Sequence, residues 1–128
     1  MIMNDIQRRL SEFIGQETEY WDFWGAIRIV KGGKRDFEAR EVGYIVNKQY
    51  QRLGYAYEAL SAVIKAFLHN GTHRIYAECD PRNTYSWKLL EKTGMKREAF
   101  FHKNIYFHKD ENGNPIWKDT YVYAIWNE

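Results

Sequence analysis

The chain has 128 residues, of which 45% are hydrophobic, 17% aromatic and 28% charged. This composition is ordinary for a globular protein and excludes an intrinsically disordered chain, and the length predicts one domain, 1–128. The net charge of +2, with both signs interspersed, does not indicate a nucleic-acid partner, because nucleic-acid-binding surfaces carry clustered basic residues.

Cysteine usage and hydropathy predict a reducing, aqueous environment. Cys79 is the only cysteine, so no internal disulfide can form. No stretch approaches the roughly 20 apolar residues that a membrane-spanning helix needs, and the first ten residues do not form a secretory apolar segment. We therefore expect a soluble cytoplasmic protein with no membrane partner, and no metal site is predicted.

Apolar periodicity predicts the elements of the first half. An amphipathic helix is expected over 6–14, a strand over 20–30 and a second strand over 38–46, and the two strands are expected to pair. Residues 47–56 are expected to be irregular. A helix over 57–69 follows, because its apolar residues recur every three to four positions.

The second half is expected to contain a strand, a helix and a long hairpin. The strand covers 74–79 and the helix 83–93. Two strands over 100–108 and 117–126 follow, joined by a turn that contains Asn112-Gly113. The resulting order, α-β-β-α-β-α-β-β, predicts an α/β protein with a mixed sheet and both long helices as crossovers.

The most informative segment is the loop 51–56, between a strand and a helix. Such a loop presents unpaired backbone N–H groups next to the positive end of the helix dipole, which suits a phosphate or pyrophosphate. Gly54 lets the backbone approach a ligand closely, because it has no Cβ. Spacing alone does not distinguish this arrangement from an ordinary turn.

Two stretches, in this order, resemble the GNAT acetyltransferases of the RimJ/RimL type. The first covers 43–60, where Gln51, Gly54 and Ala56 match the family's Gln/Arg-x-x-Gly-x-Gly/Ala loop, which holds the pyrophosphate of coenzyme A. The second covers 83–95, with the form Asn-x-x-Ser followed by Leu-Glu-Lys-x-Gly.

This resemblance implies a mixed, mostly antiparallel sheet flanked by helices, with a shortened N-terminal part. It implies an N-acetyltransferase that uses acetyl-CoA as co-substrate and acetylates a primary amine by direct attack in a ternary complex. The amine would be a protein N-terminus, a polyamine or another small metabolite. The alternative is a non-catalytic CoA-binding module with a regulatory role.

The resemblance also implies which residues contact the cofactor. They are the strand before the loop, the loop itself and the start of the later helix, namely Tyr44, Ile45, Val46, Gln51, Arg52, Leu53, Gly54, Tyr55, Ala56 and Asn83. Asn83 is equally suited to cap that helix, and the two roles are compatible.

Two candidate catalytic residues follow from the same resemblance. Glu41 matches the general base, although a solvated strand residue is an equal interpretation, and His102 or His108 is a further candidate base. Ser86 matches the residue that stabilises or protonates the departing CoA thiolate, or else it caps its helix. Leu90 stands where many members carry a tyrosine acid.

Two further features have structural interpretations. Cys79 is expected to pack in the core, because no His/Asn partners accompany it in the sequence. The aromatic run 20–24 lies in the shortened N-terminal part, and it is expected to form core or a dimer surface. We therefore expect a homodimer.

Overall fold

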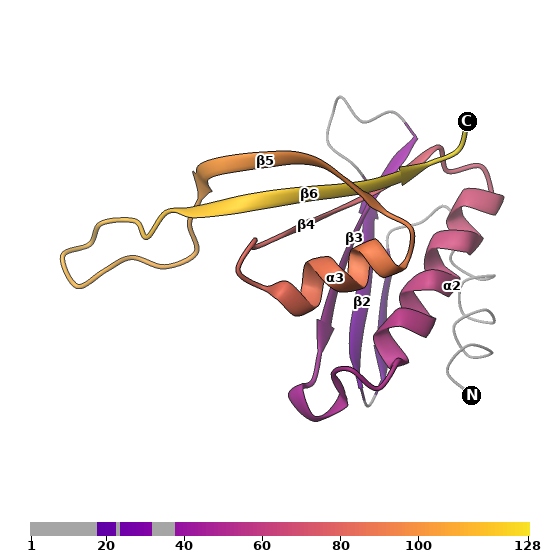
Figure 1. Cartoon of the computed structure of the whole chain (residues 1–128), viewed down its shortest axis with the longest axis horizontal. Helices are drawn as coiled ribbons and strands as arrows, with labels where there is room; N and C mark the ends of the chain where they lie inside the picture. Colours follow the sequence, from indigo (N-terminus) through magenta and orange to yellow (C-terminus); the bar gives the residue numbers. More distant parts are fainter. Residues whose placement is uncertain (1–17, 23, 32–37) are drawn as a thin grey trace.

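A computed structural model describes residues 18–22, 24–31 and 38–128. Within these residues, six strands form one sheet in the order β1-β2-β3-β4-β6-β5 (Figure 1). The elements, in chain order, are β1 (Thr18–Asp22), β2 (Gly25–Lys31), β3 (Ala39–Val46), a 3-10 turn (Lys48–Tyr50), α2 (Tyr55–His69), β4 (Arg74–Cys79), α3 (Thr84–Lys92), β5 (Lys96–Ile105) and β6 (Lys118–Trp126).

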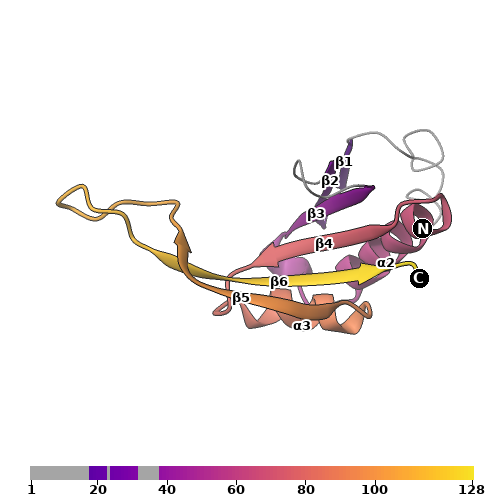
Figure 2. The same cartoon turned by 90° about the horizontal axis from the view of Figure 1, so that it is seen from above.

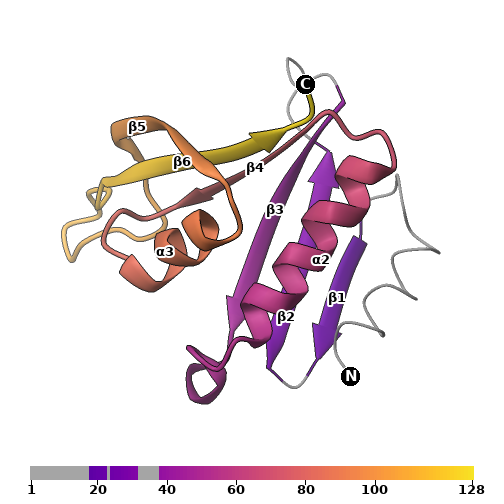
Figure 3. The same cartoon turned by 45° about the vertical axis from the view of Figure 1, so that its right-hand side comes forward.

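The sheet is mixed and mostly antiparallel, as the sequence predicts. Only the β3–β4 pair is parallel among the described strands, and α2 is the crossover between these two strands. Helix α3 connects β4 to β5, and β6 lies between those two strands. Both helices lie on the same side of the sheet (Figure 3). None of the helices in the described part of the chain has the length and apolarity to cross a membrane.

The core lies between this side of the sheet and the two helices. The apolar stripe of α2 supplies Leu60 and Phe67, and alternate residues of β2 and β3, such as Ile27 and Val42, face it. Burial of this apolar surface fixes which face of each strand points to the helices, since strand side chains alternate.

The prediction of a single strand over 20–30 is wrong, because two antiparallel strands, β1 and β2, meet within this range. Strand β1 ends at Asp22, β2 begins at Gly25, and these two residues pair across the short link. Gly25 has φ +154°, and a Cβ there would lie 1.9 Å from the carbonyl oxygen of Ile45. A glycine inside an aromatic run was the signal for this turn.

The remaining expectations for the first half are confirmed where the structure describes them. Strand β2 pairs with β3, and α2 begins two residues before the expected start. The expected helix over 6–14 lies outside the described residues. Trp24, the last residue of the aromatic run 20–24, is fully buried, so it belongs to the core and not to a dimer surface.

The second half also follows the expected order, but β5 starts at Lys96 and not at residue 100. The charged residues at the start of β5 hid it from the periodicity analysis. The carboxylate of one of them, Glu98, accepts two hydrogen bonds from the guanidinium of Arg74 on β4, with N–O distances of 2.9 and 2.6 Å. Such a bidentate pair positions both side chains.

Strands β5 and β6 extend as an arm beyond the rest of the sheet (Figure 2). Tyr106 and Trp117 pack edge to face across the arm, with ring centroids 5.3 Å apart. At its tip, one carboxylate oxygen of Asp110 accepts from the backbone N–H groups of Asn112 and Asn114, each at 2.9 Å. The turn expected from Asn112-Gly113 is confirmed.

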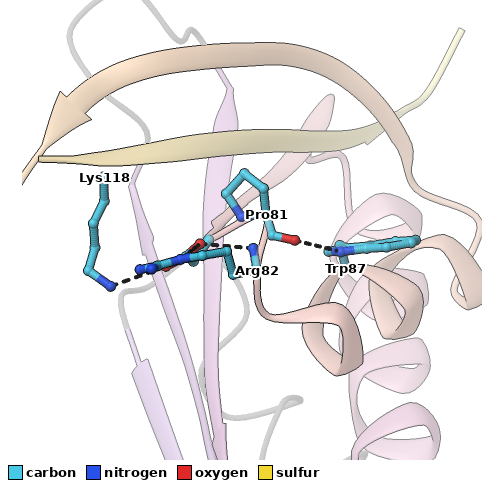
Figure 4. Close-up of polar contacts among 5 residues, drawn as sticks. Pro81, Arg82, Trp87 and Lys118 are labelled. Carbon is cyan, nitrogen blue, oxygen red and sulfur yellow. Dashed lines mark hydrogen bonds and ion pairs between the residues drawn. The ribbon is translucent and has the colours of Figure 1, made fainter.

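A group of charges fixes the turn between β4 and α3 (Figure 4). The Asp80 carboxylate accepts from the Arg82 backbone N–H at 2.9 Å and pairs with the Arg82 guanidinium at 3.2 Å. Lys118, at the start of β6, reaches the same carboxylate at 3.3 Å. The indole N–H of Trp87 donates to the Pro81 carbonyl at 3.1 Å. These contacts hold the start of α3 against the sheet.

Acid is expected to remove the contribution of Asp80 to stability. Burial alone would raise the pKa of Asp80, but hydrogen bonds from Arg82 and Lys118 outweigh it and lower the pKa from 3.8 to about 2. A depressed carboxyl pKa stabilises the folded state above the unfolded pKa and loses this effect as the pH falls toward the folded value. In urea unfolding, the difference between the wild type and Asp80→Asn should therefore be constant above about pH 5 and shrink below about pH 4. A difference that stays unchanged down to about pH 3 would contradict this account.

Candidate functional site

The site begins with a gap between β3 and β4. These neighbours pair only at three positions, Ala39–Arg74, Arg40–Ile75 and Glu41–Tyr76, and then diverge (Figure 3). Beyond them, no described strand covers the edge of β3 that faces β4. Since β2 pairs with the opposite edge of β3, the remaining backbone N–H and C=O groups of residues 42–46 point to the edge that faces β4. An extended ligand with amide groups can bind there as a strand would.

The loop after β3 leads to an uncapped helix start. Gly54 is the N-cap of α2 with φ 91°, and a glycine has no side chain that could cap the helix. The first intrahelical bond of α2 runs from the N–H of Glu58 to the carbonyl of Gly54 at 3.0 Å. The N–H groups of residues 55–57 therefore precede the helical ladder and point out of the helix end, where the dipole favours an anion.

A pocket of about 460 Å³ lies between the start of α2, with the loop before it, and one face of α3 along its whole length. Its lining residues are Arg52, Gly54, Tyr57, Thr84, Tyr85, Lys88, Leu89 and Lys92. Three of them are cations, and none pairs with a carboxylate among the described residues. The ammonium of Lys92 lies over the ring of Tyr57, 4.4 Å from its centroid. The pocket therefore suits a ligand with several negative charges and an aromatic or apolar part.

On the helix side of the gap, two hydroxyl groups meet. The Tyr44 hydroxyl lies 2.7 Å from the Ser86 hydroxyl and donates to the Ser86 backbone carbonyl at 3.0 Å. Ser86 is buried, and its backbone N–H donates to the side chain of Asn83 at 3.1 Å. Asn83 is therefore the helix cap, which was one of its two expected roles, and the Ser86 hydroxyl is free of that task.

Two carboxylates lie on the opposite face of the sheet, here called the open face because no helix of the described residues covers it. Val42 and Tyr44 face the helices, so Glu41 points to the other side of β3. On β4, Ala77 and Cys79 pack against the core, so Glu78 also points to the open face. Burial and then the nearby charge of Glu41 raise the pKa of Glu78. A carboxylate with a raised pKa is a better proton acceptor.

Glu78 was missed by the sequence analysis. Alternation along β4 gave a signal, because residues 75, 77 and 79 are apolar and Glu78 lies between them. Its proximity to Glu41 depends on the parallel register of β3 and β4, which the sequence pattern does not contain.

Other expected residues are distributed as follows. The side chains of Ile45 and Leu53 are 65% and 62% exposed, so they can still contact a ligand through side chain or backbone. Ala56 is buried in the core beneath the loop, and the Gln51 amide donates to the Val46 carbonyl at 3.3 Å. Tyr55 packs against the ring of Tyr50, at 6.1 Å between centroids.

Four remaining residues of interest are packed or lie apart from the ligand gap. Leu90 is fully buried and so serves the core. His102 is on β5, which β6 and β4 separate from the gap, and His108 lies farther along the arm. Cys79 packs at the edge of the core, and burial raises the pKa of its thiol to about 11.

The model of the acetyltransferase (GNAT) domain family matches residues 7–96. The chain is 43% identical over 89 residues to YnaD of Bacillus subtilis (strain 168), an uncharacterized N-acetyltransferase, and the match covers 69% of this chain and 49% of YnaD. The chain spans about half the length of the curated relatives that it matches first.

Solved structures share the fold. The crystal structure of an acetyltransferase (GNAT family) from Bacillus anthracis is 40% identical with a TM-score of 0.66, and the match covers 80% of this chain and 57% of that one. The structure of RimL, a ribosomal L7/L12 alpha-N-protein acetyltransferase, in complex with coenzyme A has a TM-score of 0.67 over 80% of this chain and 54% of that one. At 19% identity, the likeness to RimL is one of fold alone.

Proposed function

Since this chain belongs to the GNAT acetyltransferase family, we propose that it transfers the acetyl group of acetyl-CoA to a primary amine. The observation that carries the proposal is the continuity of two sites: a gap that accepts an extended amide chain, and an adjoining cationic pocket at a helix N-terminus. Acetyl-CoA has these parts in the same order, with a thioester at the end of an amide-containing arm and a nucleotide with three phosphate groups at the other end.

The phosphate groups have specific partners in this arrangement. The pyrophosphate lies at the start of α2, where the N–H groups of 55–57 and the glycine backbone at Gly54 receive it. The 3′-phosphate and adenosine lie in the pocket with Arg52, Lys88 and Lys92. The pantetheine arm runs from there along residues 44–46 of β3 and brings the thioester into the gap. Asn83, whose side-chain oxygen caps α3, contacts the arm with its amide nitrogen in this proposal.

The acceptor amine approaches from the open face of the sheet, where Glu41 and Glu78 lie. One of this carboxylate pair removes a proton from the amine, directly or through a water molecule, and the amine nitrogen then attacks the thioester carbon. The N–H groups of β3 that point into the gap stabilise the oxyanion that forms. The C–S bond then breaks, and the sulfur leaves on the helix side near Ser86.

The acceptor class within this proposal is a protein N-terminus, a polyamine or another small amine. The [ribosomal protein uS5]-alanine N-acetyltransferase of Escherichia coli (strain K12) is 33% identical over 73 residues, which makes peptides the first acceptors to test. A regulatory CoA-binding module is the second candidate, and it predicts CoA binding without turnover. Assembly as a homodimer and a cytoplasmic location stay predictions.

Loss of the carboxylates should separate catalysis from binding. Glu41→Gln and Glu78→Gln are each expected to lower kcat, by about 100-fold or more for the residue that accepts the proton, because a positioned general base contributes on this scale. CoA affinity should stay unchanged, since both side chains lie on the face opposite the helices. The measurement is acetyl-CoA consumption across peptide and small-amine acceptors. Full activity in both variants would contradict the proposed base, and CoA binding with no turnover of any amine by the wild type would favour the regulatory module.

The cationic pocket should distinguish CoA from dephospho-CoA. Lys88→Met and Lys92→Met are each expected to weaken CoA binding by about tenfold, because each removes a charge-assisted contact with the nucleotide phosphates. Dephospho-CoA, which lacks the 3′-phosphate, should lose less affinity in at least one variant. Calorimetric titration of both ligands tests this, with Lys65→Met, an exposed lysine of α2 outside the pocket, as the control. An equal loss of affinity for both ligands in both variants would contradict the placement of the 3′-phosphate in the pocket.

The approach of the ligand to the loop can be tested with two glycines of the same helix. Gly54 at the start of α2 and Gly71 after its end have φ 91° and 96°, and a Cβ at either position meets no protein atom within 4 Å. Valine at either site therefore introduces similar backbone strain. Only Gly54→Val should abolish the rise in melting temperature that CoA causes, because only that side chain enters the pocket. An equal CoA response in both variants would show that the loop is an ordinary turn.

A further inference from the structure

We propose that the side chain of Tyr44 is a positioning residue of the transfer reaction, which directs the Ser86 hydroxyl at the sulfur of the departing CoA. This inference rests on the proposed function and assigns a task to the Tyr44 side chain beyond the backbone contact expected for this residue. Its basis is the pair of contacts that the Tyr44 hydroxyl makes with Ser86, at 2.7 Å to the side chain and 3.0 Å to the backbone carbonyl.

The contact between these two hydroxyl groups connects the two walls of the gap. Tyr44 lies on β3, past the last residue that pairs with β4, and Ser86 lies in the first turn of α3. The two residues are 42 positions apart in the chain, and each is at least partly buried. Their contact therefore lies beneath the gap, on the helix side, where a thioester held along β3 would have its sulfur.

The hydrogen-bonding capacity of the pair allows two arrangements. Each hydroxyl has one proton to donate and two lone pairs to accept with. In the first arrangement, Tyr44 donates to the Ser86 carbonyl and the Ser86 hydroxyl donates to Tyr44. In the second, Tyr44 donates to the Ser86 hydroxyl oxygen, and the Ser86 proton is free to point at a sulfur in the gap. Rotation of two O–H bonds converts one arrangement into the other.

Among the described residues, the Cys79 thiol also lies near Ser86, and burial followed by the charge of Asp80 raises the pKa of this thiol. A thiol is a weak donor and a weak acceptor, so it competes poorly for the Ser86 proton. Tyr44 is the stronger neighbour, and its own hydroxyl also stays protonated, because burial raises its pKa.

The reaction step balances without net proton transfer through Tyr44. The C–N bond forms as an amine proton moves to the Glu41/Glu78 pair on the open face. The C–S bond breaks, and the sulfur takes the bonding electron pair and leaves as a thiolate that accepts a hydrogen bond from Ser86. Tyr44 donates to the Ser86 oxygen at the same time, and this polarises the serine O–H. The thiolate then takes a proton from solvent after it leaves the gap.

The arrangement of charges across the sheet agrees with this role. The carboxylates that would accept the amine proton lie on the open face, and the hydroxyl pair lies on the helix face. Incoming and departing groups therefore have separate partners on opposite sides of the reacting carbon. Leu90, one turn beyond Ser86, is fully buried and has no hydroxyl to offer, so Tyr44 is the phenol that the described residues bring to Ser86.

The test is a double-mutant cycle of Tyr44→Phe and Ser86→Ala, read as kcat and as KM for acetyl-CoA. Tyr44→Phe is expected to lower kcat by about tenfold, the value of one hydrogen bond to a charged transition state, with KM changed less than about twofold. In the Ser86→Ala background, the same substitution should have almost no effect on kcat, because Tyr44 acts through the serine.

Tyr123→Phe is the matched control. It removes the hydroxyl of another buried tyrosine, which donates to Glu91 at 2.6 Å and accepts from Arg97 at 3.0 Å, away from the gap. Its kcat should stay near that of the wild type even if its melting temperature falls. A Tyr44→Phe variant with unchanged kcat, or with an equal loss of kcat in both backgrounds, overturns the inference. A wild-type protein that turns over no amine overturns the proposed function and this inference with it.

Discussion

The parallel pairing of β3 with β4 over only three residues is the constraint on which the rest of the structure depends. If the two strands stayed paired to their ends, their N–H and C=O groups would satisfy each other and leave no edge for a ligand. Since they diverge after Glu41, the sheet stays joined at one end and opens at the other. In the proposed reaction the open end receives the thioester. Glu41 and Glu78 lie where the strands begin to diverge, close enough for the charge of Glu41 to raise the pKa of Glu78.

The packing of the two helices keeps this gap open. Helix α2 lies over β2 and β3 in Figure 3 and also contacts β4 and α3, while α3 contacts β4, β5 and β6, so the two helices pack together beneath the gap. The Tyr44–Ser86 contact joins the β3 wall to α3 and limits how far the walls can move apart. The Asp80 turn with Lys118 joins α3 to β6. Together these polar contacts fix the direction in which the start of α3 points.

Local features of the site could be predicted from the sequence, and contacts between distant segments could not. The glycine loop at Gly54 and the cap at Asn83 depend on residues within one turn of a helix, and the sequence contains those residues. The meeting of Glu41 with Glu78 depends on the register of two strands that are far apart in the chain. The Tyr44–Ser86 contact depends on how α3 packs. The division of the first strand at Gly25 was hidden by the aromatic residues around it.

The three cations of the pocket affect the protein even when no cofactor is bound. Arg52, Lys88 and Lys92 line one small cavity without carboxylate partners among the described residues, so in a ligand-free molecule they repel one another. If the pocket holds the nucleotide phosphates as proposed, small multivalent anions such as phosphate or sulfate compete for the same positions and relieve this repulsion. The buffer anion would then change the apparent affinity for a nucleotide by competition as well as by ionic screening.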